Sequence, residues 1–182
     1  MIRKLKELLT LFLSWVNKIF NRKKISSNLP NTIAESERIA RSIFSTINID
    51  KKKGTLKPNA FRTPSGKDEI SVNRLDYTTA DFCKSEAKRN EMPASDRNYF
   101  GLAILYKHEI TDFNFQVVYT PILTPPEQAN PYHADIKIGF IPEKGKELPI
   151  ELSHKINTLT KIARFYKDPT PHTDSWNGGN LV

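Results

Sequence analysis

One eight-residue stretch, Tyr99–Tyr106 (YFGLAILY), is almost free of polar side chains. A strand with one solvated face alternates apolar and polar residues, whereas a strand buried on both faces is apolar nearly throughout. The stretch therefore predicts a central strand of a sheet that is covered on both sides.

Other segments have strand or helix patterns around this central one. The segments EISVNRL and HADIKIGFI both alternate as strands do. In the second segment, Ala134, Ile136 and Ile138 share one face. The pattern predicts strands over 69–75, 99–106, 115–119 and 133–141, and helices over 33–46, 78–89 and 150–166 with a single turn at 107–113. This order favours an α+β fold with a mixed or antiparallel sheet of about four strands and two or three packing helices.

The helix expected over residues 33–46 has the clearest local signal. Thr32 precedes Glu35 by three residues, which is the spacing of a capping box. Ile39 and Ile43 follow four residues apart, as they would on one face of a helix.

Length and composition set outer limits. With 182 residues, of which 38% are apolar, the chain can form a real core, and no apolar run approaches the about 20 residues that a membrane-spanning helix needs. The single cysteine, Cys83, excludes an internal disulfide and a cysteine-based zinc site. We expect no cofactor and no metal.

Positive charge is concentrated at the start of the chain. Residues 1–24 hold seven basic side chains and one acidic one, so they carry +6 of the formal charge of +8. The remaining residues are nearly neutral. Specific nucleic-acid binding is disfavoured, because its basic residues belong on the folded domain.

The same segment has the pattern of an amphipathic helix. Its apolar face, which we expect to bind a membrane or a partner protein, consists of Leu5, Leu8, Leu9, Phe12, Trp15, Val16 and Ile19. A helix lying in an anionic membrane interface and a helix in a partner's groove both fit this pattern. A signal peptide lacks support because no small-residue cleavage site follows, and packing on the chain's own domain stays open. We expect a cytoplasmic protein, with attachment to the inner membrane face as an open alternative.

The segments divide the chain into four parts. These are a basic amphipathic helix (1–24), a linker with a short helix (25–60), an α+β domain (61–166) and an irregular C-terminal tail (167–182).

Polar side chains that a site needs gather near strand ends. His133 and Asp135 are two apart on one strand and therefore share a face, where His133 is a candidate to transfer protons. Arg62, Asn73, Arg74 and His133 are the candidate ligand-binding residues, because guanidinium groups bind oxyanions bidentately. Arg74, His133 and Asp135 are the catalytic candidates.

Each of these residues also has a purely structural interpretation. Arg74 is two residues from Asp76, which suits a surface ion pair, and His133 at a strand entrance suits a local hydrogen bond. His133 and Asp135 lack a third metal ligand at a diagnostic spacing.

Three segments together carry a resemblance: SVNR at 71–74, YFGLAIL at 99–105 and NPYHADI at 130–136. Over roughly residues 60–166 the chain resembles a set of small bacterial proteins that share them. The resemblance implies a bacterial source and brings no activity with it.

Two functions are consistent with these features. The first is an accessory or recognition module of a bacterial multi-protein system, such as a defence or toxin system, held at a membrane or on a partner through residues 1–24. The alternative is a small enzyme, or a protein that binds a nucleotide or phosphate ligand through the arginine and histidine cluster.

Overall fold

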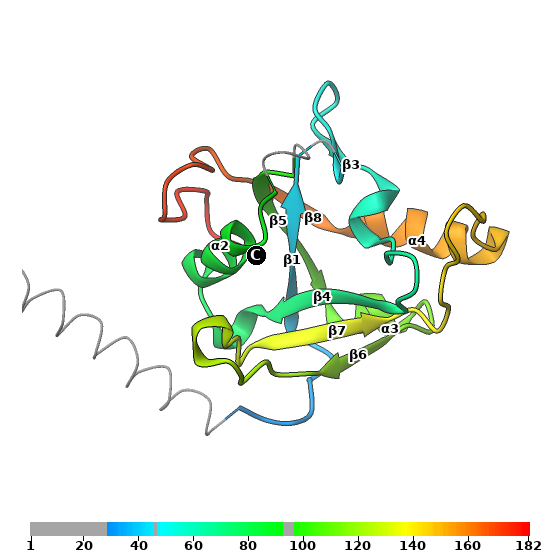
Figure 1. Cartoon of the computed structure of the whole chain (residues 1–182), viewed down its shortest axis with the longest axis horizontal. Helices are drawn as coiled ribbons and strands as arrows, with labels where there is room; N and C mark the ends of the chain where they lie inside the picture. Colours follow the sequence, from blue (N-terminus) through cyan, green and yellow to red (C-terminus); the bar gives the residue numbers. More distant parts are fainter. Residues whose placement is uncertain (1–28, 46, 93–96) are drawn as a thin grey trace, which may run out of the picture. The chain divides into compact units, whose positions relative to one another are not determined.

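The computed structural model describes residues 29–45, 47–92 and 97–182, and residues 32–182 form one unit. Its main sheet has six strands: β1 (Arg38–Phe44), β4 (Glu69–Arg74), β5 (Tyr99–Tyr106), β6 (Gln116–Tyr119), β7 (His133–Lys137) and β8 (Arg164–Lys167). They lie in the order β6-β7-β4-β1-β5-β8, and all neighbours are antiparallel (Figure 1). A separate hairpin pairs β2 (Ile49–Asp50) with β3 (Thr55–Leu56).

In the described part of the chain, three α-helices and three short 3-10 helices connect the strands. The α-helices are α2 (Ala80–Arg89), α3 (Lys107–Thr111) and α4 (Ile150–Ile162). The 3-10 helices are η1 (Pro58–Phe61), η2 (Leu75–Tyr77) and η4 (Pro126–Gln128). The predicted α+β class is confirmed, and of the two sheet types expected, mixed or antiparallel, the sheet is antiparallel. Helices α2 and α4 correspond to two of the predicted helices, whereas the predicted number of about four strands is too low.

The helix predicted over 33–46 is wrong, because this segment forms strand β1. Ile39 and Ile43 are four residues apart, and a spacing of four places two side chains on one face of a strand as well as of a helix. Ala40 and Phe44 repeat the same spacing on the other face, and all four side chains are buried. A strand that pairs with β5 along seven residues can bury both faces, and this pairing decides the conformation.

The last helix also ends earlier than predicted. We expected it to run over 150–166, but α4 ends at Ile162, and Ala163 is already extended with a ψ of 127°. The following residues form β8, which pairs with β5 at the edge of the sheet. Tyr166, which falls within the predicted helix, consequently lies on a strand.

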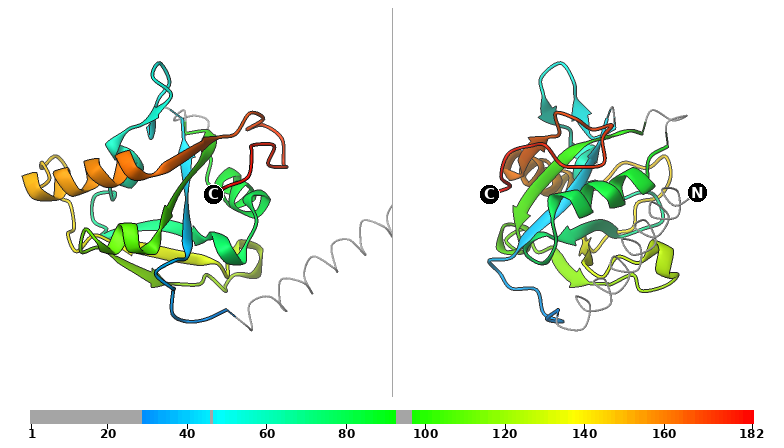
Figure 2. Two further views of the ribbon diagram at one scale, coloured as in Figure 1. Left: turned by 180° about the vertical axis from the view of Figure 1, so that it is seen from behind. Right: turned by 90° about the vertical axis from the view of Figure 1, so that its left-hand side faces the viewer.

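Strands β1 and β5 separate two apolar cores. Ile39, Ile43 and Leu105 belong to the first core, which α4 covers with Leu152, Ile156 and Leu159. Ala40, Phe44, Leu102 and Ile104 belong to the second, which α2 covers with Cys83 and Ala87. Figures 1 and 2 show α2 and α4 on opposite sides of β1. The two-sided burial predicted for 99–106 is therefore confirmed.

Strand β1 diverges from β4 almost as soon as the two strands meet. Only Ile39 with Arg74 and Ala40 with Asn73 are paired. Beyond these pairs β1 runs upward in Figure 1, while β4 and its neighbours β7 and β6 run across the view. The residues that follow Ala40 in β1 therefore have no β4 partner, and a space opens between the strands.

The amphipathic helix predicted over residues 1–24, with its apolar face from Leu5 to Ile19, lies outside the described residues. Among the helices of the described ranges, none has the length and apolar character required to cross a bilayer.

A buried ion pair fastens the C-terminal segment to α2. The Lys84 Nζ lies 2.7 Å from Asp168 Oδ2, and both side chains are completely buried. The same ammonium donates to the carbonyl oxygens of Thr170 and Ser175, each at 2.7 Å. Lys88, one helical turn along α2, binds the same segment through Asp174, but its partner is 99% exposed.

We predict that Lys84→Met destabilises the protein by about 3–5 kcal/mol, because it leaves the Asp168 carboxylate buried without a counter-charge. The matched variant Lys88→Met removes an exposed pair and should cost about 1 kcal/mol or less. Urea unfolding of both variants measures the difference. Equal losses of unfolding free energy would show that the buried pair does not hold this segment.

Candidate functional site

The structure places Arg74 in a structural clamp. Its Nε and Nη2 donate to the two carboxylate oxygens of Glu37 at 2.6 and 2.9 Å, and its side chain is completely buried. Tyr77 and Tyr119 cover its guanidinium, each with the ring centroid 4.7 Å away. Burial alone would lower the pKa of Arg74, but the hydrogen bonds and charge of Glu37 outweigh burial and raise it.

Because Arg74 is buried and bound to Glu37, it is not part of the candidate site. Asn73 faces His133 directly across the β4–β7 pair, and adjacent residues of a strand point to opposite faces. The expected gathering of Arg74 with His133 therefore does not occur. The suggested ion pair with Asp76 does not form either, since Asp76 binds Arg38 with an oxygen–nitrogen distance of 2.6 Å.

Asn73 and His133, in contrast, line one cavity. The Asn73 Oδ1 accepts a hydrogen bond of 2.8 Å from Asn130 Nδ2, while Asn130 Oδ1 accepts from the Tyr132 amide. This network fixes the orientation of both amides. The Asn73 Nδ2 group is left with no hydrogen-bond partner among the described residues, so the cavity gains a donor at β4.

The imidazole of His133 is held by Thr120. Its Nδ1 lies 2.8 Å from the Thr120 carbonyl oxygen, which can only accept, so Nδ1 carries a proton. The Thr120 hydroxyl donates to Asp135 Oδ2 at 2.7 Å. The His133 Nε2 and the Asp135 Oδ1 are 3.8 Å apart, which is too long for a direct hydrogen bond. The predicted pair thus shares a face, linked through Thr120.

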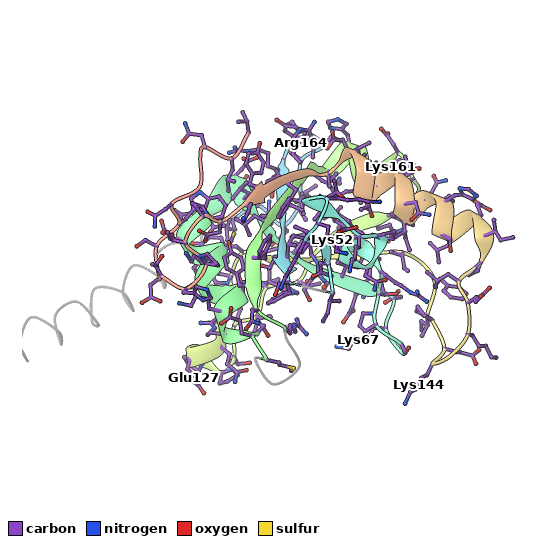
Figure 3. All side chains as sticks on the ribbon, turned by 90° about the horizontal axis from the view of Figure 1, so that it is seen from above. Lys52, Lys67, Glu127, Lys144, Lys161 and Arg164 are labelled. Atoms are coloured by element: carbon purple, nitrogen blue, oxygen red, sulfur yellow. The ribbon has the colours of Figure 1, made fainter. Side chains whose placement is uncertain are left out.

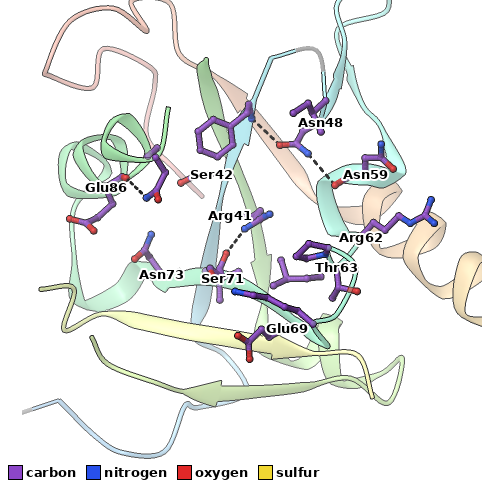
Figure 4. A pocket seen from close by; sticks show the side chains of 18 of the residues that line it. Arg41, Ser42, Asn48, Asn59, Arg62, Thr63, Glu69, Ser71, Asn73 and Glu86 are labelled. Atoms are coloured by element: carbon purple, nitrogen blue, oxygen red, sulfur yellow. Dashed lines mark hydrogen bonds between the residues drawn. The ribbon is translucent and has the colours of Figure 1, made fainter. Parts of the chain in front are cut away.

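The cavity occupies the opening between β1 and β4 and has a volume of ≈ 640 Å³ (Figure 4). Its lining includes Arg62, Asn73 and His133, three of the four predicted ligand-binding residues. It also includes basic residues that the sequence analysis did not select, and these are Arg41, Lys67 and Arg97.

Arg41 bridges the diverging strands. Its Nε donates to the Ala60 carbonyl oxygen at 3.2 Å, and its Nη1 donates to the Ser71 carbonyl oxygen at 2.7 Å (Figure 4). Among the described residues, no carboxylate lies within 4 Å of this guanidinium. The pKa of Arg41 is lowered to about 10, first by burial and then by the charge of Arg97, while Asp135 acts in the opposite direction.

Arg97 supplies a second cation to the same cavity. Its guanidinium lies 4.4 Å from the centroid of the Phe44 ring, and it too has no carboxylate partner in the described part of the chain. Thr63 lies in the cavity wall with a buried hydroxyl that has no hydrogen-bond partner among the described residues.

The acidic residues of the wall are already neutralised. Glu69 binds Lys137 with an oxygen–nitrogen distance of 2.6 Å, and Glu86 forms an ion pair with Arg89. The cations of the cavity therefore exceed its free anions, and most of its uncommitted polar groups are donors. In the described ranges no group of three histidine, cysteine, aspartate or glutamate residues is placed to hold a metal.

Comparison with family models, curated proteins and solved structures found no significant match, so function is argued from geometry alone. The bacterial source and the likeness to small bacterial proteins stay predictions.

The sequence contained one signal for the missed residue Arg41. In the segment RIARSIF, Arg41 is a charged residue between two pairs of apolar residues. A charged residue is unusual in a segment whose neighbouring side chains are buried. The helix prediction concealed this signal, because on an isolated helix Arg41 lies away from Ile39 and Ile43 and is readily solvated.

Cys83 is a core residue and not a nucleophile. It is completely buried in the second core, and burial, followed by the charge of Glu86, raises the pKa of its thiol to about 12. We predict that iodoacetamide does not modify the native protein at pH 8, where only about 10⁻⁴ of such a thiol is ionised. Mass spectrometry before and after urea unfolding checks this, and rapid native labelling would contradict it.

Proposed function

We propose that the protein binds a small anionic ligand in the cavity between β1 and β4. The observation that carries the proposal is Arg41, a partly buried cation with no carboxylate within 4 Å among the described residues. Burying such a charge is costly, and an anion bound beside it would offset that cost. Arg41 and Arg97 here take the place that the sequence analysis gave to Arg74.

The remaining polar groups of the cavity support an anion. Arg62 and Lys67 add positive charge along the wall, and the Asn73 amide adds a neutral donor. A guanidinium has five N–H donors. In the described residues two of the Arg41 donors bind carbonyl oxygens, so three remain for a ligand. The guanidinium of Arg97 contacts the Phe44 ring, and none of its N–H groups forms a hydrogen bond in the described part of the chain.

Binding is better supported than catalysis. His133 has the proton of Nδ1 committed to Thr120, and its Nε2 faces Asp135 at 3.8 Å. No serine or cysteine nucleophile lies within hydrogen-bond distance of this imidazole in the described residues. We therefore assign His133 to ligand recognition.

A second proposal concerns residues 1–24, which carry +6 of the total charge of +8 together with the apolar set from Leu5 to Ile19. Basic residues near an anionic bilayer each contribute about 1 kcal/mol, so this segment suits a peripheral tether. The protein would then act as a recognition module of a multi-protein system, held at a surface or on a partner protein, with the cavity displayed by the domain.

The anion site predicts that inorganic phosphate raises the melting temperature of the full chain at constant ionic strength, because a ligand that binds only the folded state stabilises it. Arg97→Gln should weaken phosphate binding about 10-fold or more, since each lost charge-assisted bond removes that much affinity. Isothermal titration calorimetry measures the dissociation constants.

Arg164→Gln is the matched control. Arg164 is also partly exposed and pairs with Glu109, but it does not line the cavity, and Figure 3 shows it far from Lys67. Its loss should change phosphate affinity less than 2-fold, as screened surface charges do. Equal weakening by both variants, or no phosphate binding by the wild type, would contradict an anion site in this cavity. Arg41→Gln provides a second test if its fold is intact.

The tether predicts that the full chain sediments with vesicles of phosphatidylcholine and phosphatidylglycerol, whereas residues 25–182 stay in the supernatant. Raising the salt concentration should release the full chain in part, because the charge attraction is screened while the apolar contact is not. Vesicles of phosphatidylcholine alone are the control. Equal sedimentation of both chains would exclude residues 1–24 as the membrane contact.

A further inference from the structure

Resting on the proposed anion site, we propose that the ligand is a phosphate ester whose organic part carries a hydroxyl group. The phosphate binds the donors of Arg41 and Arg97, and the hydroxyl donates to the acceptor pair formed by His133 Nε2 and Asp135 Oδ1.

The cavity is much larger than one inorganic anion requires. Its volume of ≈ 640 Å³ lies within the range of about 300–1,000 Å³ that is typical of sites for organic ligands. Apolar side chains also line it, among them Ile47, Ala87 and Ile122. A ligand that fills such a space has a carbon skeleton attached to its anionic group.

The acceptor pair is built into the fold. Thr120 holds both members, since its carbonyl oxygen fixes the His133 Nδ1–H and its hydroxyl fixes Asp135 Oδ2. With the proton on Nδ1, a neutral imidazole has Nε2 as its acceptor, and this is the form that the proposal requires. Among the described residues, no group donates a hydrogen bond to Nε2 or Oδ1, and the two side chains are 13% and 9% exposed. His133 lines the cavity, and Asp135 lies beside it on the same strand face, opposite the lining residue Ser71.

The acceptor pair and the donors lie on adjoining strands. His133 faces Asn73 across the β4–β7 pair, and Asp135 faces Ser71, whose carbonyl oxygen binds Arg41. Side chains at directly opposed positions are about 5 Å apart at their Cβ atoms. The charge of Asp135 acts on Arg41, because it offsets a part of the lowering of the Arg41 pKa by burial and by Arg97. One small molecule can therefore span the donor end and the acceptor pair.

A hydroxyl satisfies the acceptors better than an ammonium does. The cavity wall already holds four cations, Arg41, Arg62, Lys67 and Arg97, and a further positive charge beside them would be repelled. A hydroxyl donates one proton without adding charge. Sugar phosphates and nucleotides combine a phosphate and a hydroxyl within a few ångströms, and either source fits this chemistry.

Titration calorimetry of the full chain with four probes tests the proposal: inorganic phosphate, ethyl phosphate, 2-aminoethyl phosphate and ribose 5-phosphate. Ribose 5-phosphate should bind about 5- to 10-fold more tightly than ethyl phosphate, which is the contribution expected of one or two hydrogen bonds to a charged or polar acceptor. Adenosine 5′-phosphate, compared with ribose 5-phosphate, then distinguishes a nucleotide from a sugar phosphate.

Two variants locate the effect. Asp135→Asn weakens one acceptor, and His133→Phe removes the other while keeping a ring. Both should lower the ratio of the ribose 5-phosphate and ethyl phosphate affinities toward one. Because the ratio compares two ligands of the same variant, a partial loss of folded protein cancels in it. Arg164→Gln should leave the ratio at its wild-type value.

The outcomes separate the two proposals. Equal affinities for ethyl phosphate and ribose 5-phosphate would overturn the hydroxyl inference and leave the anion site standing. Tighter binding of 2-aminoethyl phosphate than of ribose 5-phosphate would overturn it in favour of an ammonium ligand. Binding of none of the four probes would overturn the anion site itself. An unchanged ratio in both variants would show that the acceptor pair does not contact the ligand.

Discussion

Two strands that pair over only two residues and then diverge leave backbone groups on their facing edges without strand partners. Carbonyl oxygens that lose their strand partner need donors from another source, and at this point of the sheet a side chain supplies them. Arg41 donates to Ser71 on β4 and to Ala60 in η1, and thereby ties three elements together across the opening. The divergence lets β1 cross between two cores while β4 and β7 turn a polar face to the cavity. Both the shape of the cavity and its charge depend on this one arrangement.

A guanidinium suits this position for reasons of geometry. Its donors form a rigid planar fork, so two of them can bind the protein while others stay directed elsewhere. The ammonium of a lysine would satisfy the carbonyl oxygens as a point charge, without this separation of directions. The cost of the position is an unbalanced charge in a partly buried site, and it appears in the lowered pKa of Arg41. Lysines such as Lys52, Lys144 and Lys161 incur no such cost, because they are exposed to solvent.

The elements predicted well from the sequence are those whose local pattern has only one explanation. The apolar run 99–106 forms the strand predicted for it, and the strand predicted over 133–141 forms over its first five residues. Helix α2 begins two residues after the predicted start at residue 78, with Thr79 as its N-cap. The segment 38–44 could not be assigned in this way, because its spacing of four satisfies a helix and a strand equally. Its long-range pairing with β5 decides between them, and no local window of sequence contains that information.

Two arginines show why the candidate site was only partly predictable. Arg74 looked functional because it follows Asn73 at a strand end, yet one step along a strand reverses the face, and Glu37, far away in the sequence, neutralises it. Arg41 looked solvated, yet it borders the cavity with no carboxylate beside it among the described residues. The side chains are identical, and only the counter-charge differs. A buried cation that has its counter-charge within the fold contributes to the structure, whereas one that lacks it is balanced most simply by a ligand.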